Sequence, residues 1–177
     1  MNERKVILYI AMSLDGYIAR PDGDISWLSL VEQKGEDYGY GEFISTVDTV
    51  IIGRKTYDTV LRFGVPFPHS DKKCFVITRT NRPSENNVTF YTKGMDELIA
   101  GLREIDGTNI FVDGGAEIVH ELLRLELIDE YIISIIPVML GSGIRLFNDH
   151  HPEQRLRSTS IKKFASGLVQ LHYAVVH

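Results

Sequence analysis

The chain has 177 residues and a formal net charge of −5 at pH 7, which is enough chain for one domain with a sizeable core. The acidic balance argues against general nucleic-acid binding, because such binding depends on a broad positive surface. A single cysteine, Cys74, excludes an internal disulfide and a zinc site built from several cysteines. We see no secretory signal and no apolar run of about 18 residues, so we expect a cytoplasmic protein that contacts no membrane.

Apolar runs bounded by turn residues predict the strands of one sheet. The last two runs flank Ala165-Ser166-Gly167, which predicts an antiparallel hairpin. In the final run, apolar residues alternate with Gln170 and His172, so we expect one half-buried face there. The expected strands cover residues 6–11, 49–53, 73–78, 88–91, 109–113, 127–138, 158–164 and 168–176.

Apolar residues at helical spacing predict the helices. They are expected near residues 40–47, 54–61, 95–102 and 116–123. Alternation of strands and helices, closed by a hairpin, predicts an α/β fold with a mainly parallel central sheet, helices on both faces and an antiparallel edge. No linker divides the chain, so we expect a single domain over residues 1–177. Residues 12–37 form a long segment rich in Gly, Asp and Ser, and such segments are often functional lids.

Gly53-Arg54-Lys55-Thr56 follows a buried strand and begins a helix. Backbone N–H groups, two cations and a hydroxyl are thereby placed together, and such a corner suits a phosphate group. An ordinary turn followed by a helix with solvated cations explains the same residues, since short motifs often match by chance.

Two later strand ends repeat this theme. Thr78-Arg79 ends the next strand, and arginine pairs with phosphate through two parallel bonds. Gly114-Gly115 stands between a strand and a helix, where it lets a ligand approach the backbone. Taken singly, these are a surface arginine and a turn. Together with Arg54 they fit a dinucleotide with a ribose 2′-phosphate, which is NADPH rather than NADH.

Two further loops have open interpretations. Asp15-Gly16 is a common turn pair, and beside a cofactor the same segment could fold over the nicotinamide. The glycines in Gly141-Ser142-Gly143 permit a tight turn, or a flexible connection between edge strands. His150 and His151 lie in a polar loop without matching carboxylates, so we expect no metal site.

At this point the residues resemble a known superfamily. Gly53-Arg54-Lys55-Thr56-Tyr57 is similar to the glycine–arginine–x–threonine–aromatic motif of dihydrofolate reductases. Thr78-Arg79 and Gly114-Gly115 stand where that family has its second phosphate-binding arginine and its paired glycines. Residues 13–19 and 137–147 resemble instead the reductase domain of the bifunctional riboflavin-biosynthesis deaminase/reductase, which shares the fold.

The resemblance implies a dihydrofolate-reductase-like three-layer fold and an NADPH-dependent reductase that acts on a pterin, a pyrimidine or a related heterocycle. It also implies a cis bond between Gly114 and Gly115, and a homodimer. The residues and the resemblance together give as predicted cofactor contacts Ala11, Leu14, Asp15, Gly16, Gly53, Arg54, Lys55, Thr56, Thr78, Arg79, Gly114, Gly115, Ala116 and Glu117.

Two acids compete as the proton donor. Dihydrofolate reductases carry an acid five residues after a lid tryptophan, and Glu32 has that spacing from Trp27. Asp37 is an equal candidate, and a packing role for Trp27 with a solvated Glu32 is the plain alternative. The deaminase motifs are absent, and residues 57–62 replace the acidic run of riboflavin-pathway reductases. A nucleotide-binding module with little turnover, or a structural protein of this fold, are therefore retained as alternatives.

Overall fold

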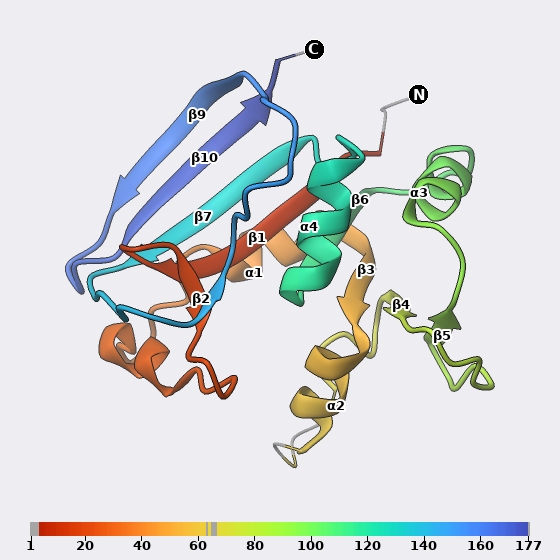
Figure 1. Ribbon diagram of the computed structural model, residues 1–177, viewed down its shortest axis with the longest axis horizontal. Coiled ribbons are helices and arrows are strands. Elements are labelled where there is room, and N and C mark those ends of the chain that lie inside the picture. The colour runs from red at the N-terminus through yellow and green to blue at the C-terminus, as the bar shows by residue number, and fades with distance from the viewer. Residues whose placement is uncertain (1–3, 63, 65–66, 177) are drawn as a thin grey trace.

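The computed structural model describes residues 4–62, 64 and 67–176. Its main sheet has eight strands in the order β5-β4-β3-β6-β1-β7-β10-β9. The first six of these pair in parallel, whereas β10 is antiparallel to both β7 and β9. The α/β fold with an antiparallel C-terminal hairpin is therefore confirmed (Figure 1).

The strands are β1 (Val6–Ser13), β2 (Tyr17–Ala19), β3 (Val47–Gly53), β4 (Lys73–Ile77), β5 (Val88–Tyr91), β6 (Asn109–Gly114), β7 (Glu130–Ile136), β8 (Ile144–Arg145), β9 (Leu156–Lys163) and β10 (Val169–Val175). The helices are the 3-10 helix η1 (Ser26–Val31), α1 (Tyr40–Ser45), α2 (Arg54–Arg62), α3 (Met95–Arg103) and α4 (Ala116–Arg124). Among the described residues, no helix has the length and apolar character that a bilayer crossing needs.

Two segments differ from the sequence expectation. The segment after residue 11 is not an irregular lid, because β1 continues to Ser13 along β7 and is followed by β2 and η1. Val47 was expected on a helix face, but it begins β3, where it pairs with Asn109. Residues 63–72 lie between the helix expected at 54–61 and the strand expected at 73–78. Their described positions form a loop, and residues 63, 65 and 66 lie outside the described part.

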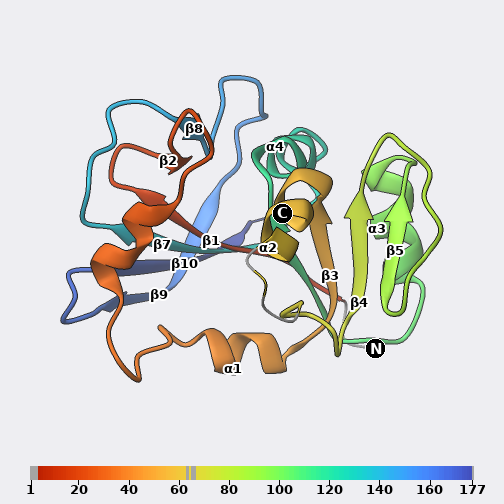
Figure 2. The same cartoon turned by 90° about the horizontal axis from the view of Figure 1, so that it is seen from below.

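The alternation of side chains along the strands creates two cores. Ile51 and Val112 face α3 and α4, whereas Ile52 faces Tyr57 of α2 and Phe111 faces α1. Figure 2 shows α1 and α4 on opposite sides of the sheet. Ile51, Ile52 and Val112 are fully buried, and each such side chain contributes about 1.5–3 kcal/mol. Both faces of the central strands are thus apolar, as helices on both faces require.

The hairpin strand β10 reverses the burial expected for it. Gln170 is 1% exposed, while its apolar neighbours along the strand are only partly buried. Its Nε2 donates to Tyr9 Oη at 3.0 Å and to Ser134 Oγ at 3.2 Å. A buried amide is stable here because these hydroxyls replace the water it loses. The other residues of β10 are all partly buried, so neither face of the strand is purely solvent-facing.

A buried arginine holds the opposite, amino edge of the parallel strands together. Arg4 is 3% exposed and donates to the carbonyl oxygens of Thr108 and Leu102, both at 2.9 Å. It also donates to Thr49 Oγ1 at 2.8 Å and forms an ion pair with Asp48. One guanidinium therefore joins the start of β3, the end of α3 and the loop before β6.

Candidate functional site

The predicted strand ends meet at the carboxyl edge of the sheet. β3 lies between β4 and β6, with Gly53 paired to Ile77 and Ile52 paired to Gly114. Figure 1 shows α2 leaving the lower end of β3, on the side where β2 and β8 also lie. Since all three strands are parallel, the residues that follow them share one edge. The structure therefore brings together the corner motifs at residues 53–56, 78–79 and 114–117.

Gly53 and Gly115 leave little room for side chains at this edge. A Cβ on Gly115 would lie 3.2 Å from Thr56 Oγ1 and 3.6 Å from Gly53 Cα. Gly115 has φ +83° and Gly114 has φ +110°, which favour glycine. The described residues contain no cis peptide bond, so the cis bond expected between these glycines is not found. Bare backbone from β3 and β6 thus lies in direct contact, where a Cβ would fill the space.

Helix α4 begins directly after this contact, at Ala116, with Gly115 as its N-cap. The Gly115 carbonyl accepts the first helical bond, from Ile118 N at 3.0 Å. The N–H groups of the first turn have no acceptor inside a helix, so they point toward the edge and favour an anion there. Residues 115–117 therefore fit the phosphates of a dinucleotide.

Three cations surround the same place. Arg54 pairs with Asp58 at 2.7 Å, one turn along α2, and Lys55 pairs with Glu117 at 2.9 Å. The bond and charge of Lys55 lower the pKa of Glu117, and the charges of Arg79 and Arg54 lower it further. Lys55 and Glu117 are both more than two-thirds exposed, and such pairs contribute about 0–1 kcal/mol. A phosphate can therefore replace Glu117 as the partner of Lys55 at little cost.

The two residues after β4 differ in their contacts: Thr78 bonds within the protein, whereas Arg79 is exposed. Thr78 is 8% exposed, and its Oγ1 accepts from Thr80 N at 3.1 Å. Its hydroxyl is thus used to turn the chain after the strand. Arg79 is exposed and makes no ion pair within the part of the chain that the structure describes. Of the three cations, Arg79 is the one that holds no carboxylate.

The predicted contacts from the first strand surround a carboxylate that joins two loops. Asp15 accepts from Ser13 Oγ at 2.6 Å, from Leu140 N at 3.1 Å and from Gly141 N at 2.7 Å. These bonds, led by that of Ser13, lower the pKa of Asp15 to about 2. Next to it, Leu14 is 63% exposed and Gly16 turns the chain with φ +86°. Ala11 is partly buried against the cluster that contains Trp27.

The lowered pKa of Asp15 predicts that its contribution to folding stability depends on pH. Its pKa falls from 3.8 to about 2 on folding, so the carboxylate stabilises the fold above about pH 4 and loses this effect as the pH falls toward 2. The urea midpoint of Asp15→Asn should therefore lie below that of wild type at pH 7, and the gap should narrow between pH 4 and pH 2. Asp22→Asn, an exposed acid of the next turn, is the control. A gap that stays constant with pH would contradict this role.

The glycine loop at residues 141–143 also belongs to this edge. β8 pairs with β2, and Leu146 N donates to Gly16 O at 3.0 Å. A Cβ on Gly143 would overlap the carbonyl oxygen of Ala19, so only glycine permits this approach. The glycine loop is therefore held beside the first loop by the two-residue strand β8 that follows it.

Neither predicted proton donor lies among the converging strand ends. Glu32 is exposed at the end of η1, and no hydrogen bond of its carboxylate occurs among the described residues. Asp37 accepts from Gly39 N at 2.9 Å and Gly41 N at 3.0 Å, which lowers its pKa. Trp27 is 3% exposed and packs with Val31 and Ile136. Trp27 thus has the packing role, whereas the assignment of a donor stays a prediction.

Sequence reasoning missed a buried pair beside the glycines. His69 Nε2 lies 2.9 Å from Asp113 Oδ2, and His69 is 1% exposed. Asp113 directly precedes Gly114 on β6. The signal available in the sequence was an acid at the end of an otherwise apolar strand, but nothing in its spacing pointed to a histidine 44 residues earlier.

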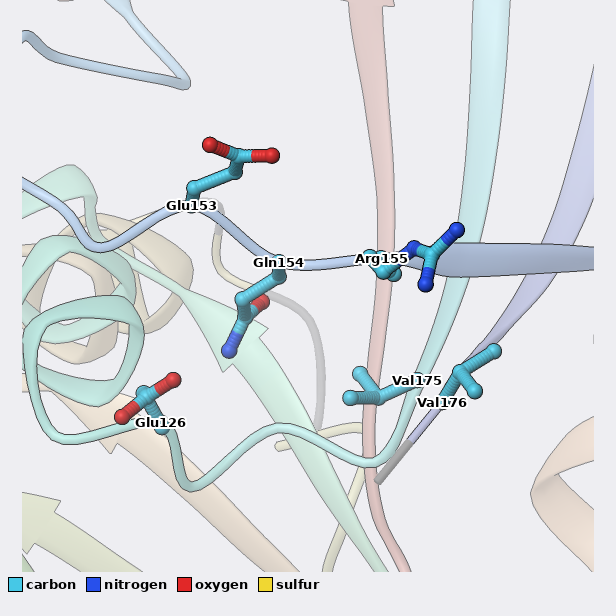
Figure 3. Close-up of a pocket in the computed structure, with 6 residues that line it drawn as sticks. All are labelled: Glu126, Glu153, Gln154, Arg155, Val175 and Val176. Carbon is cyan, nitrogen blue, oxygen red and sulfur yellow. The ribbon is translucent and has the colours of Figure 1, made fainter.

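A pocket of about 230 Å³ lies where β10 ends beside the start of β7, which is the amino edge of the parallel strands. Figure 3 shows its lining side chains. Its lining residues are Glu126, Glu153, Gln154, Arg155, Val175 and Val176. Ligand pockets commonly enclose about 300–1,000 Å³, so this one is small for a dinucleotide. We therefore place the candidate site at the carboxyl edge. No group of three or more potential metal ligands occurs in the described part of the chain.

Comparison with known proteins identifies the family. The RibD C-terminal domain family matches residues 4–170. The chain belongs to this family. The sequence motifs resembled those of dihydrofolate reductases and of riboflavin-pathway reductases. The family match and the shared fold confirm that resemblance. Among curated proteins, the uncharacterized protein YwjB of Bacillus subtilis (strain 168) is 47% identical over 172 residues, covering 97% of this chain and 98% of YwjB.

Solved structures support membership of the RibD C-terminal domain family. A protein of Shewanella sp. PV-4, provisionally assigned to riboflavin biosynthesis, is 31% identical with a TM-score of 0.89, covering 98% of this chain and 99% of that one. The diaminohydroxyphosphoribosylaminopyrimidine deaminase/5-amino-6-(5-phosphoribosylamino)uracil reductase of Thermotoga maritima is 16% identical with a TM-score of 0.73. This chain covers 57% of that longer protein, and the likeness shows the shared fold.

Proposed function

We propose that this protein is an NADPH-dependent reductase of a small heterocycle, either a pterin or a pyrimidine. The observation that carries the proposal is the convergence of bare glycine backbone, a helix start and three cations at adjacent parallel strand ends. NADPH would supply the hydride, and the protein would supply position and electrostatics. Family membership supports the same class of activity.

Different residues would contact the pyrophosphate, the 2′-phosphate and the nicotinamide of the cofactor. The Gly53–Gly115 contact and the first turn of α4 offer N–H groups to the pyrophosphate. Arg79, with Arg54, would hold the 2′-phosphate, because a guanidinium binds phosphate oxygens in a planar fork. Leu14 and Gly16 lie at the end of β1 and would cover the nicotinamide from the adjacent edge.

A second candidate function is a nucleotide-binding module with little turnover. The specific observation that favours it is the state of the two acids. Asp37 has a lowered pKa because two backbone N–H groups stabilise its charged form, so it is a poor proton donor. Glu32 is exposed at the end of η1. Turnover would then need another donor, or water.

Cofactor selectivity tests the proposal. NADPH should bind at micromolar strength, and NADH should bind about tenfold or more weakly, since it lacks the phosphate that makes charge-assisted bonds. Arg79→Ala should reduce NADPH affinity about tenfold and leave NADH affinity unchanged, as measured by quenching of the single tryptophan or by calorimetry. Arg124→Ala, on the exposed end of α4, is the matched control. Equal affinities for both cofactors in wild type would remove the phosphate assignment.

Turnover separates the two candidate functions. NADPH oxidation should be followed with 7,8-dihydrofolate and with 5-amino-6-(5-phosphoribosylamino)uracil. Oxidation with either one supports the reductase and names its substrate class, whereas NADPH binding without oxidation across a wider panel of pterins and pyrimidines supports the binding module. A homodimer also stays a proposal, and light scattering at micromolar concentration would test it.

A further inference from the structure

Strand β9 forms an open edge of the main sheet. It is last in the strand order, and among the described strands only β10 pairs with it. Figure 1 shows β9 along the outer side of the sheet, with β10 on its inner side. Every residue of β9 is exposed except Ser160, which is partly buried. An edge of eight residues is long enough to pair with another extended chain.

The pairing of β9 with β10 decides which backbone groups of β9 face outward. Phe164 N donates to Leu168 O at 2.9 Å, where the hairpin turns. Along an antiparallel pair, bonded and non-bonded positions alternate. Counted from Phe164 along the register of the two strands, the N–H and C=O groups of Lys163 and Ile161 point away from β10, and those of Lys162 point toward it. Such outward groups are the donors and acceptors that an added strand binds.

The same edge is basic, although the chain as a whole is acidic. Residues 155–163 contain no acid and four cations, in a chain whose net charge is −5. The cations are Arg155, Arg157, Lys162 and Lys163. None of them forms an ion pair with another residue in the described part of the chain. Their charge is therefore open to a partner outside the chain.

This charge decides which extended chain fits beside β9. If a second copy paired β9 with β9, the register that sets Arg157 opposite Lys162 would place cation against cation, which is destabilising. Lysine on an edge strand commonly prevents such self-pairing. An acidic segment meets attraction instead. Leu156 and Ile161 are 44% and 64% exposed, so they offer apolar contact to alternate residues of that segment.

We propose that β9 binds an acidic, extended segment of a partner protein, which adds to the sheet as a further strand. The outward backbone groups align the segment, and the four cations select its acidic sequence. The proposal is independent of the proposed function, because β9 carries none of the candidate cofactor contacts. A nucleic acid has the same sign of charge but no row of amide groups at strand spacing, so it fits this edge less well.

Fluorescence anisotropy with a dye-labelled peptide of about eight residues, in which valine alternates with aspartate, tests the proposal. At about 50 mM salt the dissociation constant should be about 100 μM or lower. The same peptide with lysine for aspartate should not bind. Methylation of two adjacent central amide nitrogens keeps the charge but blocks both edges of the peptide, so it should weaken binding about tenfold or more.

Charge reversal on the protein gives a matched pair of variants. Arg157→Glu combined with Lys162→Glu should weaken the aspartate peptide about tenfold or more, because two attractions become repulsions. Arg62→Glu combined with Arg124→Glu makes the same change in net charge on α2 and α4, and it should bind the peptide like wild type. This comparison separates a local effect at β9 from the overall charge of the protein.

Hydrogen exchange followed by NMR locates the added strand. The amides of Ile161 and Lys163 should exchange about tenfold or more slowly when the peptide is bound, whereas Lys162, already bonded to β10, should change little. The proposal is overturned if the aspartate peptide does not bind, if its methylated form or the β9 variant binds equally well, or if these amides stay unprotected. It is also overturned if single-stranded RNA of equal charge binds as tightly, or if wild type is a dimer that Ile161→Pro dissociates, since a second copy would then occupy the edge.

Discussion

Arg4→Met should lower the free energy of unfolding by about 3 kcal/mol. The guanidinium satisfies the carbonyl oxygens of Thr108 and Leu102 and the side chains of Thr49 and Asp48. Methionine fills a similar volume but donates to none of them. The loss combines buried acceptors without donors, each costing about 1–3 kcal/mol, with a carboxylate that loses its cation. Because Asp48 is one-third exposed, water recovers part of this loss.

Urea denaturation followed by tryptophan fluorescence measures the effect of Arg4→Met well, since the lone tryptophan, Trp27, is 3% exposed in the folded protein. Arg124→Met is the control. It removes an arginine whose pair with Glu121 is exposed on both sides, so its urea midpoint should match that of wild type. Similar losses in the two variants would show that the network at the amino edge is not the source of stability we assign to it.

Gly115→Val should weaken NADPH binding about 100-fold or more. A branched side chain is strained at φ +83°, and its Cβ would lie 3.2 Å from Thr56 Oγ1 and 3.6 Å from Gly53 Cα. To relieve both contacts, the ends of β3 and β6 must separate, which moves the N–H groups of α4 away from the cations of α2. Calorimetry with NADPH measures the loss, and circular dichroism checks that the variant is folded.

Gly35→Val is a closely matched control for this prediction. Gly35 has the same φ of +83°, but a Cβ there would meet nothing within 4 Å. Backbone strain is thus common to both variants, and only Gly115→Val closes the contact between strands. We expect Gly35→Val to lose a little stability and to bind NADPH like wild type. Equal loss of binding in both variants would attribute the effect to strain alone.

The strands and helices were predictable where the apolar residues follow a single pattern, either a continuous run or helical spacing. Buried parallel strands such as β3 and β6 are continuous apolar runs, and α3 carries four buried residues at helical spacing. Prediction was wrong where tertiary pairing decides. The strand β2 has three residues and exists because β8, more than 120 residues away, pairs with it. Gln170 is buried because the hydroxyls of Tyr9 and Ser134 come from other strands.

The candidate site was likewise predictable in one respect and not in another. Motifs that stand at strand ends were locatable, because parallel strands bring their ends to one edge whatever the details of packing. Side-chain partners were not. The sequence placed Arg54 and Lys55 beside a phosphate without showing that Asp58 and Glu117 hold them in the structure described here. Asp15 was expected to contact the cofactor, and its three hydrogen bonds to the protein depend on a loop that begins at residue 138.

The pairing between residues 13–19 and 138–146 has a kinetic consequence. Leu14 N donates to Val138 O, Leu146 N donates to Gly16 O, and Asp15 accepts from Leu140 and Gly141. Neither segment can detach without breaking the bonds of the other, so their amide protons should exchange with deuterium through a shared opening event. A protease cut within residues 148–153 would leave the two segments associated, since the cleaved ends lie outside the bonded stretch.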